Sequence, residues 1–343
     1  NNVISLKAGD AFFNVYKKSK VGSIKENTLT NNSTGVIKFG FKLTSSASVK
    51  EITKNTMSAT KGGMITDTGI LVDSKSKVTS GIKSNTIGKS KTTGIKIVNG
   101  STVKGISSNK LTTTDNEYVA NNGILVDKST VSAAISKNQI GKVKTTAIKI
   151  ANASTTKAIS SNKIVAKKKS SNVANTGILV DNKSKVNGNI NKNEIGKVKT
   201  TAIKIAKSST TKSITENKIM GSKASTTVAN TAILLDNKVK VSGSISKNTI
   251  GTVTGTAIKL AKSQVTGSIE SNDIATCKGD GILVYNSSKV GKDITKNKIK
   301  KARFGVSVIT KSTVKGSIKK NTIKKATSKK VNVDKTSKGK VKK

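Results

Sequence analysis

One short pattern recurs along the chain and limits its possible folds more than any other feature. The pattern Ile-x-x-Asn-x-(Ile, Leu or Met) occurs twelve times, at intervals of 24 to 31 residues. Its asparagines are Asn27, Asn55, Asn85, Asn109, Asn138, Asn162, Asn193, Asn217, Asn248, Asn272, Asn297 and Asn321. A period of this length is typical of a solenoid, in which every repeat is one coil that buries its apolar side chains by stacking on its neighbours.

Each repeat contains three short apolar segments separated by Gly, Asn, Ser, Thr and Lys. One segment lies before the Asn, as at Val78, one surrounds it, and one follows as a Gly-Ile-x-Val block such as residues 123–126. Ile and Val in alternation are typical of strands, and no stretch keeps a helical period. The absence of Pro suits strands that donate hydrogen bonds on both sides. We therefore predict an all-β chain, a single parallel β-helix of about 12 coils with three strands per coil.

Composition excludes several classes of function. The chain is 33% hydrophobic with a net charge of +47, which would favour disorder if the apolar residues were not placed at regular inward positions. With no His and one Cys, it lacks imidazole chemistry, an internal disulfide and a Cys-cluster metal site. No apolar run is long enough to span a bilayer. We expect no cofactor, no metal and no membrane insertion.

The recurrent asparagines have a structural explanation. Asn tolerates the left-handed conformation and can make a sharp corner between two strands. Stacked at one corner, the side-chain amides can bond to each other and to the backbone from coil to coil. We therefore interpret the twelve asparagines as a structural ladder and not as a ligand site.

These corners, each followed by a Gly-Ile-x-Val strand, resemble the right-handed parallel β-helix repeats of the pectin-lyase-like superfamily over about residues 10–325. The resemblance implies the fold, and it implies that any groove lies along the strand of the Gly-Ile-x-Val block. That superfamily includes polysaccharide lyases and hydrolases, adhesins, tailspikes and non-catalytic surface proteins, so the resemblance does not choose a function.

The outward residue of each Gly-Ile-x-Val block alternates between lysine and leucine. The series runs Lys42, Leu71, Lys96, Leu125, Lys149, Leu179, Lys204, Leu234, Lys259, Leu283 and Ser307. Coils with leucine are longer and carry inserts at 112–122, 165–176 and 220–231, which we expect to fold over the leucines. The short coils add further lysines. The candidate residues for binding an anionic polymer are Lys42, Lys91, Lys96, Lys144, Lys149, Lys199, Lys204 and Lys259. The alternative is a solvated face that only keeps the protein soluble.

No catalytic constellation is visible, and no catalytic residue is assigned. Asp73, Asp127, Asp181 and Asp236 follow the strands of long coils at a spacing of roughly 10 Å, too wide for one Ca²⁺ or a carboxylate pair. The only arginine, Arg303, lies in a Lys-rich coil. Cys277 is expected to be a small buried residue.

The two ends differ from the repeats between them. At the N-terminus, Val3, Ile4 and Leu6 can supply a partial strand. Residues 324–343 are rich in lysine and poor in apolar residues, so we expect a β-helix at 1–323 and a flexible C-terminal tail at 324–343. Since the chain begins with Asn and not Met, we expect that a leader has been removed and that the protein is extracellular or on the cell surface.

The leading hypothesis is a non-catalytic exported β-solenoid, an adhesin or a structural or wall-associated protein, whose lysines engage an anionic polysaccharide or cell-wall polymer. One alternative is a polysaccharide lyase or hydrolase, and another is a subunit that stacks end to end into an extracellular filament. Nucleic acid would bind only non-specifically, because few aromatic residues are present for base stacking.

Overall fold

The computed structural model describes residues 2–6, 9–31, 37–59, 66–113, 117–168, 171–221 and 226–342. These residues form strands and turns and no helix, and the strands build a parallel β-solenoid of about 13 turns with three faces. The strands fall into two compact units, Asn1–Lys168 and Lys169–Lys343. The prediction of an all-β parallel β-helix with three strands per coil is confirmed.

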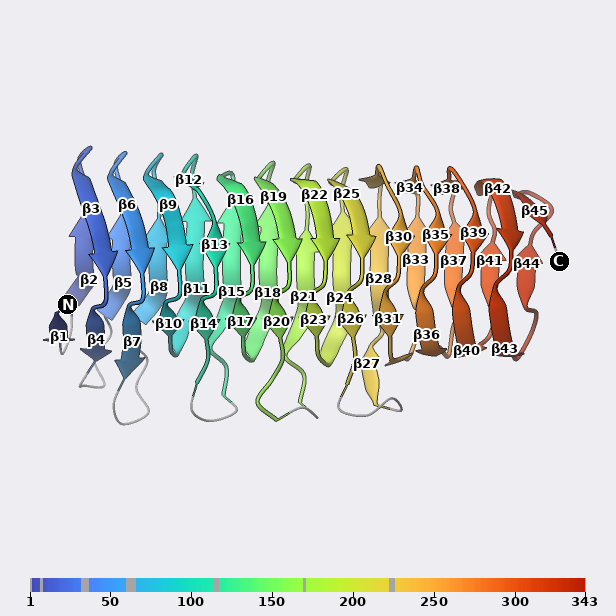
Figure 1. Ribbon diagram of the computed structural model, residues 1–343, viewed down its shortest axis with the longest axis horizontal. Helices are drawn as coiled ribbons and strands as arrows, with labels where there is room; N and C mark the ends of the chain where they lie inside the picture. The colour runs from blue at the N-terminus through green and yellow to red at the C-terminus, as the bar shows by residue number, and fades with distance from the viewer. Residues whose placement is uncertain are drawn as a thin grey trace. The chain divides into compact units, whose positions relative to one another are not determined.

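In the first unit each coil adds one strand to each of three parallel sheets, called A, B and C (Figure 1). Sheet A contains β1 (Val3–Leu6), β4 (Thr28–Asn31), β7 (Thr56–Ala59), β10 (Thr86–Ile87), β14 (Lys110–Leu111), β17 (Gln139–Ile140) and β20 (Lys163–Ile164). Sheet B contains β2 (Gly9–Val15), β5 (Ile37–Leu43), β8 (Thr66–Val72), β11 (Ser90–Val98), β15 (Ala120–Asp127) and β18 (Val143–Ala151). Sheet C contains β3 (Lys20–Lys25), β6 (Ser48–Thr53), β9 (Lys77–Lys83), β12 (Thr102–Val103), β13 (Ile106–Ser107), β16 (Thr130–Ser136) and β19 (Thr155–Ser160).

The second unit has the same three faces. Sheet A contains β23 (Glu194–Ile195), β26 (Lys218–Ile219), β31 (Thr249–Ile250), β36 (Asp273–Thr276), β40 (Lys298–Ala302) and β43 (Thr322–Ala326). Sheet B contains β21 (Ala174–Val180), β24 (Val198–Ala206), β28 (Thr231–Asp236), β33 (Ile258–Ala261), β37 (Ile282–Tyr285), β41 (Val306–Val308) and β44 (Val331–Val333). Sheet C contains β22 (Lys185–Asn191), β25 (Thr210–Thr215), β29 (Lys240–Val241), β30 (Ile245–Ser246), β34 (Gln264–Val265), β35 (Ile269–Glu270), β38 (Lys289–Val290), β39 (Ile294–Thr295), β42 (Thr313–Lys319) and β45 (Lys338–Val341). A separate pair joins β27 (Thr227–Ala229) and β32 (Thr252–Val253).

The core consists of columns of identical or similar side chains that the pairing register brings into line. In sheet B, Ile70, Ile95 and Ile124 occupy neighbouring strands at the same register position, and each is fully buried. Such columns need only a few apolar residues per coil, because every residue is covered by the coils before and after it. This arrangement explains how a chain with 33% hydrophobic residues closes a continuous core.

The asparagines form a continuous hydrogen-bonded ladder within each unit. In the first unit the Nδ2 of each Asn from Asn27 to Asn138 donates to the Oδ1 of the Asn in the next coil, over 2.9 to 3.0 Å. The second unit repeats these bonds from Asn193 to Asn321. Each buried amide is therefore paired, which avoids the cost of an unsatisfied polar group in the core.

The left-handed residue of each corner is not the asparagine. Positive φ angles lie one position earlier, as at Lys54 with 55° and Ser108 with 57°. The whole set is Glu26, Lys54, Ser84, Ser108, Lys137, Ser161, Lys192, Glu216, Lys247, Ser271, Lys296 and Lys320. The expectation that Asn itself takes this conformation is therefore wrong. The Asn directs its side chain into the ladder, and the solvent-facing residue before it makes the bend.

The segment expected to be a flexible tail at 324–343 forms the last coil through residue 342. Its strands β43, β44 and β45 pair in parallel with β40, β41 and β42. Ile323 is 6% exposed, and Val331 and Val333 are half-buried. A terminal coil is covered on one side only, so these few apolar residues suffice. At the other end, the partial strand expected from Val3 forms as β1 and pairs with β4.

Candidate anion-binding face

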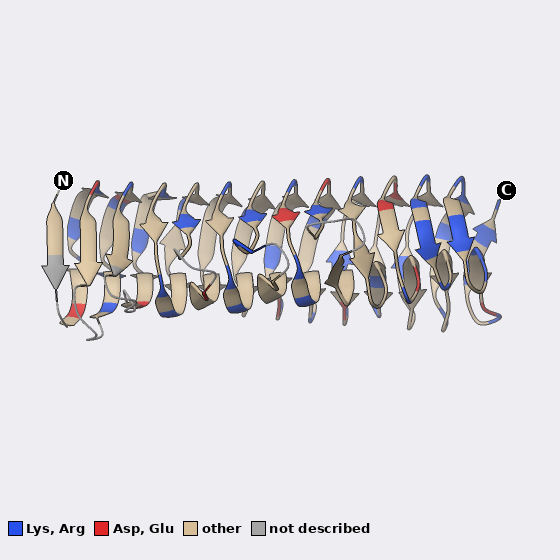
Figure 2. Cartoon of the chain, turned by 90° about the horizontal axis from the view of Figure 1, so that it is seen from below, with Lys and Arg blue, Asp and Glu red and all other residues tan. Residues whose placement is uncertain are grey.

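Sheet B carries the alternating lysine and leucine positions, and the pairing register sets them side by side. In the first unit Leu71 pairs with both Lys42 and Lys96, and Leu125 pairs with both Lys96 and Lys149. In the second unit the column runs Leu179, Lys204, Leu234, Lys259, Leu283 and Ser307. Neighbouring strands lie about 4.8 Å apart, so the lysines recur at roughly 10 Å. We call these positions the sheet B column; Figure 2 shows the distribution of basic residues over the strands.

The lysines of the sheet B column differ in their partners. Lys42 forms an ion pair with Asp10 at 2.7 Å, and Lys204 lies 3.8 Å from Asp236. Lys259 stands over the ring of Tyr285, with Nζ 5.0 Å from the centroid. Within the part of the chain that the structure describes, Lys96 and Lys149 form no ion pair. These two half-buried lysines therefore keep their charge available to an external anion.

The inserts of the long coils do not bury the leucines as expected. Leu71 is 6% exposed, but Leu125, Leu179 and Leu234 are only half-buried. The described end of each insert joins the strand ladder: Val119 is fully buried, its N–H donates to Lys142 O and its carbonyl accepts from Ser90 N–H. Val173 and Val228 are buried equally. The tips at 114–116, 169–170 and 222–225 lie outside the described residues.

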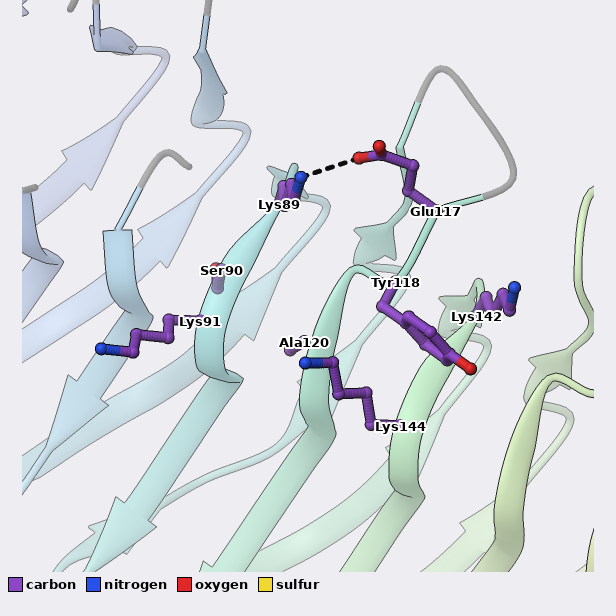
Figure 3. A pocket seen from close by; sticks show the side chains of 8 residues that line it. All are labelled: Lys89, Ser90, Lys91, Glu117, Tyr118, Ala120, Lys142 and Lys144. Carbon is purple, nitrogen blue, oxygen red and sulfur yellow. Dashed lines mark ion pairs between the residues drawn. The ribbon is translucent and has the colours of Figure 1, made fainter. Parts of the chain in front are cut away.

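A pocket of about 460 Å³ opens where the first insert rejoins sheet B (Figure 3). It is lined by Lys89, Ser90, Lys91, Glu117, Tyr118, Ala120, Lys142 and Lys144. Two of the predicted lysines, Lys91 and Lys144, thus share one cavity with two more lysines of the same short coils. Lys199, at the corresponding place in the second unit, is exposed on β24.

The pocket combines an aromatic ring with an uneven charge. Lys142 Nζ lies 4.5 Å and Lys144 Nζ 5.9 Å from the centroid of Tyr118. Across the pocket, Lys89 pairs with Glu117 at 2.8 Å, as Figure 3 shows. Four lysines against one glutamate leave 4 − 1 = +3 on the lining. The site suits a ligand that is negatively charged and able to contact a ring.

The carboxylates at the ends of the long-coil strands bind neighbouring side chains of the protein. Asp73 Oδ1 accepts a hydrogen bond from Asn99 Nδ2 at 2.8 Å, and Asp127 Oδ1 accepts one from Asn152 Nδ2 at 2.8 Å. Asp181 lies 3.6 Å from Lys207. In the described ranges, no three residues of the metal-ligating types lie close enough to hold an ion. These aspartates fasten one coil to the next.

Cys277 and Arg303 have structural surroundings in the second unit. Cys277 is 3% exposed, and burial raises the pKa of its thiol to about 12, so the thiolate is strongly disfavoured. Arg303 pairs with Asp280 at 3.0 Å, and the Asp280 side chain is 1% exposed. Burial raises the pKa of Asp280, and the Arg303 guanidinium partly opposes this shift. The arginine therefore compensates a buried carboxylate.

Two features were not identified from the sequence. A buried serine lies two positions before the Val of most coils, and its Oγ accepts a backbone N–H from the preceding coil; Ser129 Oγ accepts Ser101 N–H at 3.2 Å and Ser154 Oγ accepts Ser129 N–H at 3.1 Å. The repeated Ser-x-Val spacing would have revealed this second ladder. Tyr118 was also missed, although an aromatic residue is conspicuous in a chain with 2% aromatics.

Comparison with known proteins identifies no relative. No protein-family model, no curated protein and no solved structure matches the chain. Among the described residues, no helix is long and apolar enough to cross a membrane. What is known of the molecule is therefore its fold, a parallel β-solenoid, and the chemistry of its surface.

Proposed function

We propose that this protein is a non-catalytic, exported β-solenoid, an adhesin or wall-associated structural protein, whose sheet B column binds anionic polymers. The observation that carries the proposal is the in-register alternation of Lys and Leu on one face. A row of cations at a repeat of roughly 10 Å suits an extended chain with a regular spacing of negative charges. The half-buried leucines between the lysines give such a chain apolar contacts as well.

Electrostatics supports the same proposal. A net charge of +47 attracts polyanions from a distance, and the acidic residues in the described ranges are scattered and form no metal-binding cluster. The resemblance of the repeat to pectin-lyase-like β-helices is compatible with an extracellular partner such as a uronate-bearing polysaccharide or teichoic acid. That resemblance alone does not choose between binding and catalysis, and the proposal takes binding because no catalytic group has been assigned.

The test replaces Lys96, Lys149 and Lys204 together with Gln and measures binding to polygalacturonate by isothermal titration calorimetry. We expect the dissociation constant to rise about tenfold or more at 50 mM NaCl, because three charges on the binding face are lost. The matched control replaces Lys104, Lys157 and Lys212, which are exposed on or beside strands of sheet C, and removes the same charge. Equal weakening in the two triple variants would show bulk attraction only and would reject the sheet B column.

A further inference from the structure

The pocket beside Tyr118 occurs at one insert and breaks the repetition of the chain. Tyr118 directly precedes the buried Val119, whereas Asn172 and Thr227 directly precede Val173 and Val228 in the other inserts. The lysines beside it are not exceptional, because the same short-coil positions are Lys197 and Lys199 in the second unit. The ring is therefore the feature that distinguishes this place from the rest of the basic surface.

The ring is held in position and remains accessible. The backbone next to it is fixed, since Val119 is fully buried and its N–H and carbonyl are hydrogen-bonded to Lys142 and Ser90. Tyr118 itself is 41% exposed, so part of its ring can meet a ligand. Lys142 and Lys144 reach the ring from β18 and the turn before it, and Figure 3 shows them on one side of the pocket with the Lys89–Glu117 pair on the other.

The pocket is continuous with the sheet B column. Lys91 and Lys96 lie on the same strand, β11, and Lys144 and Lys149 lie together on β18. A polymer that follows the column past Leu125 therefore runs alongside the pocket, within a few residues along each strand. One unit of such a polymer can enter the pocket while its neighbours remain on the column.

We propose that the Tyr118 pocket is a subsite for an anionic sugar ring, and that it selects ring-bearing polyanions over flexible ones. An aromatic face packs against the apolar C–H face of a sugar ring, and the lysines pair with its carboxylate or sulfate. A linear polyphosphate offers charge but no ring face. The inference rests on the proposed function, because it assigns selectivity within the same binding face.

The experiment compares three probes of similar charge: oligogalacturonate, a sulfated oligosaccharide of the same length, and linear polyphosphate. Tyr118 is replaced with Thr, the residue found at the same place in the third insert as Thr227. We expect Tyr118→Thr to weaken binding of at least one sugar probe about tenfold and to leave polyphosphate binding within twofold. Which sugar probe responds shows whether the pocket takes a carboxylate or a sulfate. A loss for neither sugar probe, or an equal loss for all three probes, overturns the subsite.

Further variants test whether the aromatic ring itself makes the contact. Tyr118→Phe keeps the ring and should bind within twofold of the unchanged protein, and a tenfold loss would reject the ring face as the contact. Tyr118→Leu keeps apolar bulk and should lose affinity for the sugar, also if the Thr variant fails to fold. Tyr16→Thr, at an exposed tyrosine with Lys17 over its ring, is the control and should change nothing.

The two proposals fail in different ways. If the unchanged protein binds none of the probes, or if the triple Lys96, Lys149 and Lys204 variant binds all of them normally, the proposed function is wrong. If the triple variant loses affinity for every probe while Tyr118→Thr behaves like the unchanged protein, only the subsite is wrong.

Discussion

At the scale of the residue, the stability of each unit depends on single side chains that satisfy several buried groups at once. Asn109 is fully buried and accepts hydrogen bonds from Asn85 N–H and Nδ2, each at 3.0 Å. Its own Nδ2 donates to Ile82 O at 2.9 Å and to Asn138 Oδ1 at 3.0 Å. An exposed lysine on the same coil makes no comparable set of contacts, so the repeat tolerates surface variation but not corner variation.

Replacing Asn109 with Ala should therefore lower the free energy of unfolding by about 3 kcal/mol, because buried donors and acceptors on both neighbouring coils lose their partner. Urea denaturation followed by circular dichroism measures this change. Asn321→Ala at the half-buried end of the ladder is the matched control and should cost about 1 kcal/mol. If Asn109→Ala is no more harmful than the control, the buried part of the ladder stabilises the corner no more than its exposed end does.

At the scale of the element, the sequence predicts what repeats and misses what occurs once. The Asn frame and the Ile and Val positions are enough to place the strands, since each coil imposes the same requirement on its neighbours. The corner at Ser108 was misplaced by one residue, because the pattern marks the buried Asn and not the variable residue that bends. Tyr118 contributes to a pocket through residues of three coils, and no spacing within one repeat reveals such a set.

The final coil is the element whose role was misread, and its hydrogen bonds give a direct test. Gly305 N–H donates to Lys329 O at 3.2 Å, and Val306 N–H donates to Lys330 O at 3.0 Å. Truncation after Asn321 removes these acceptors, so we expect the Gly305 and Val306 amides to exchange with deuterium at least tenfold faster. Removal of residues 342–343 alone is the control. Unchanged protection at Val306 would mean that the last coil is not docked on the one before it.

At the scale of the whole molecule, the net charge of +47 acts on stability and on binding with opposite sign. Like charges face each other on neighbouring strands of the second unit, where Lys301 pairs with Lys325, and Figure 2 shows basic residues concentrated on β40 and β43. Such repulsion opposes folding and is screened by salt, whereas attraction to an external polyanion is also screened. One variable should therefore strengthen the fold and weaken the complex.

Raising NaCl from 10 to 300 mM should accordingly increase the melting temperature by several degrees, because screening over a Debye length of about 10 Å or less relieves the self-repulsion of the basic chain. Over the same range, affinity for polygalacturonate should fall at least tenfold, as counterions compete with the polymer. Scanning calorimetry and titration calorimetry on one preparation measure the two effects. A neutral osmolyte at equal osmolarity is the control and should leave affinity unchanged. A melting temperature that falls with salt would show that ion pairs such as Lys42–Asp10 outweigh the net repulsion, and affinity independent of salt would exclude a charge-driven complex on sheet B.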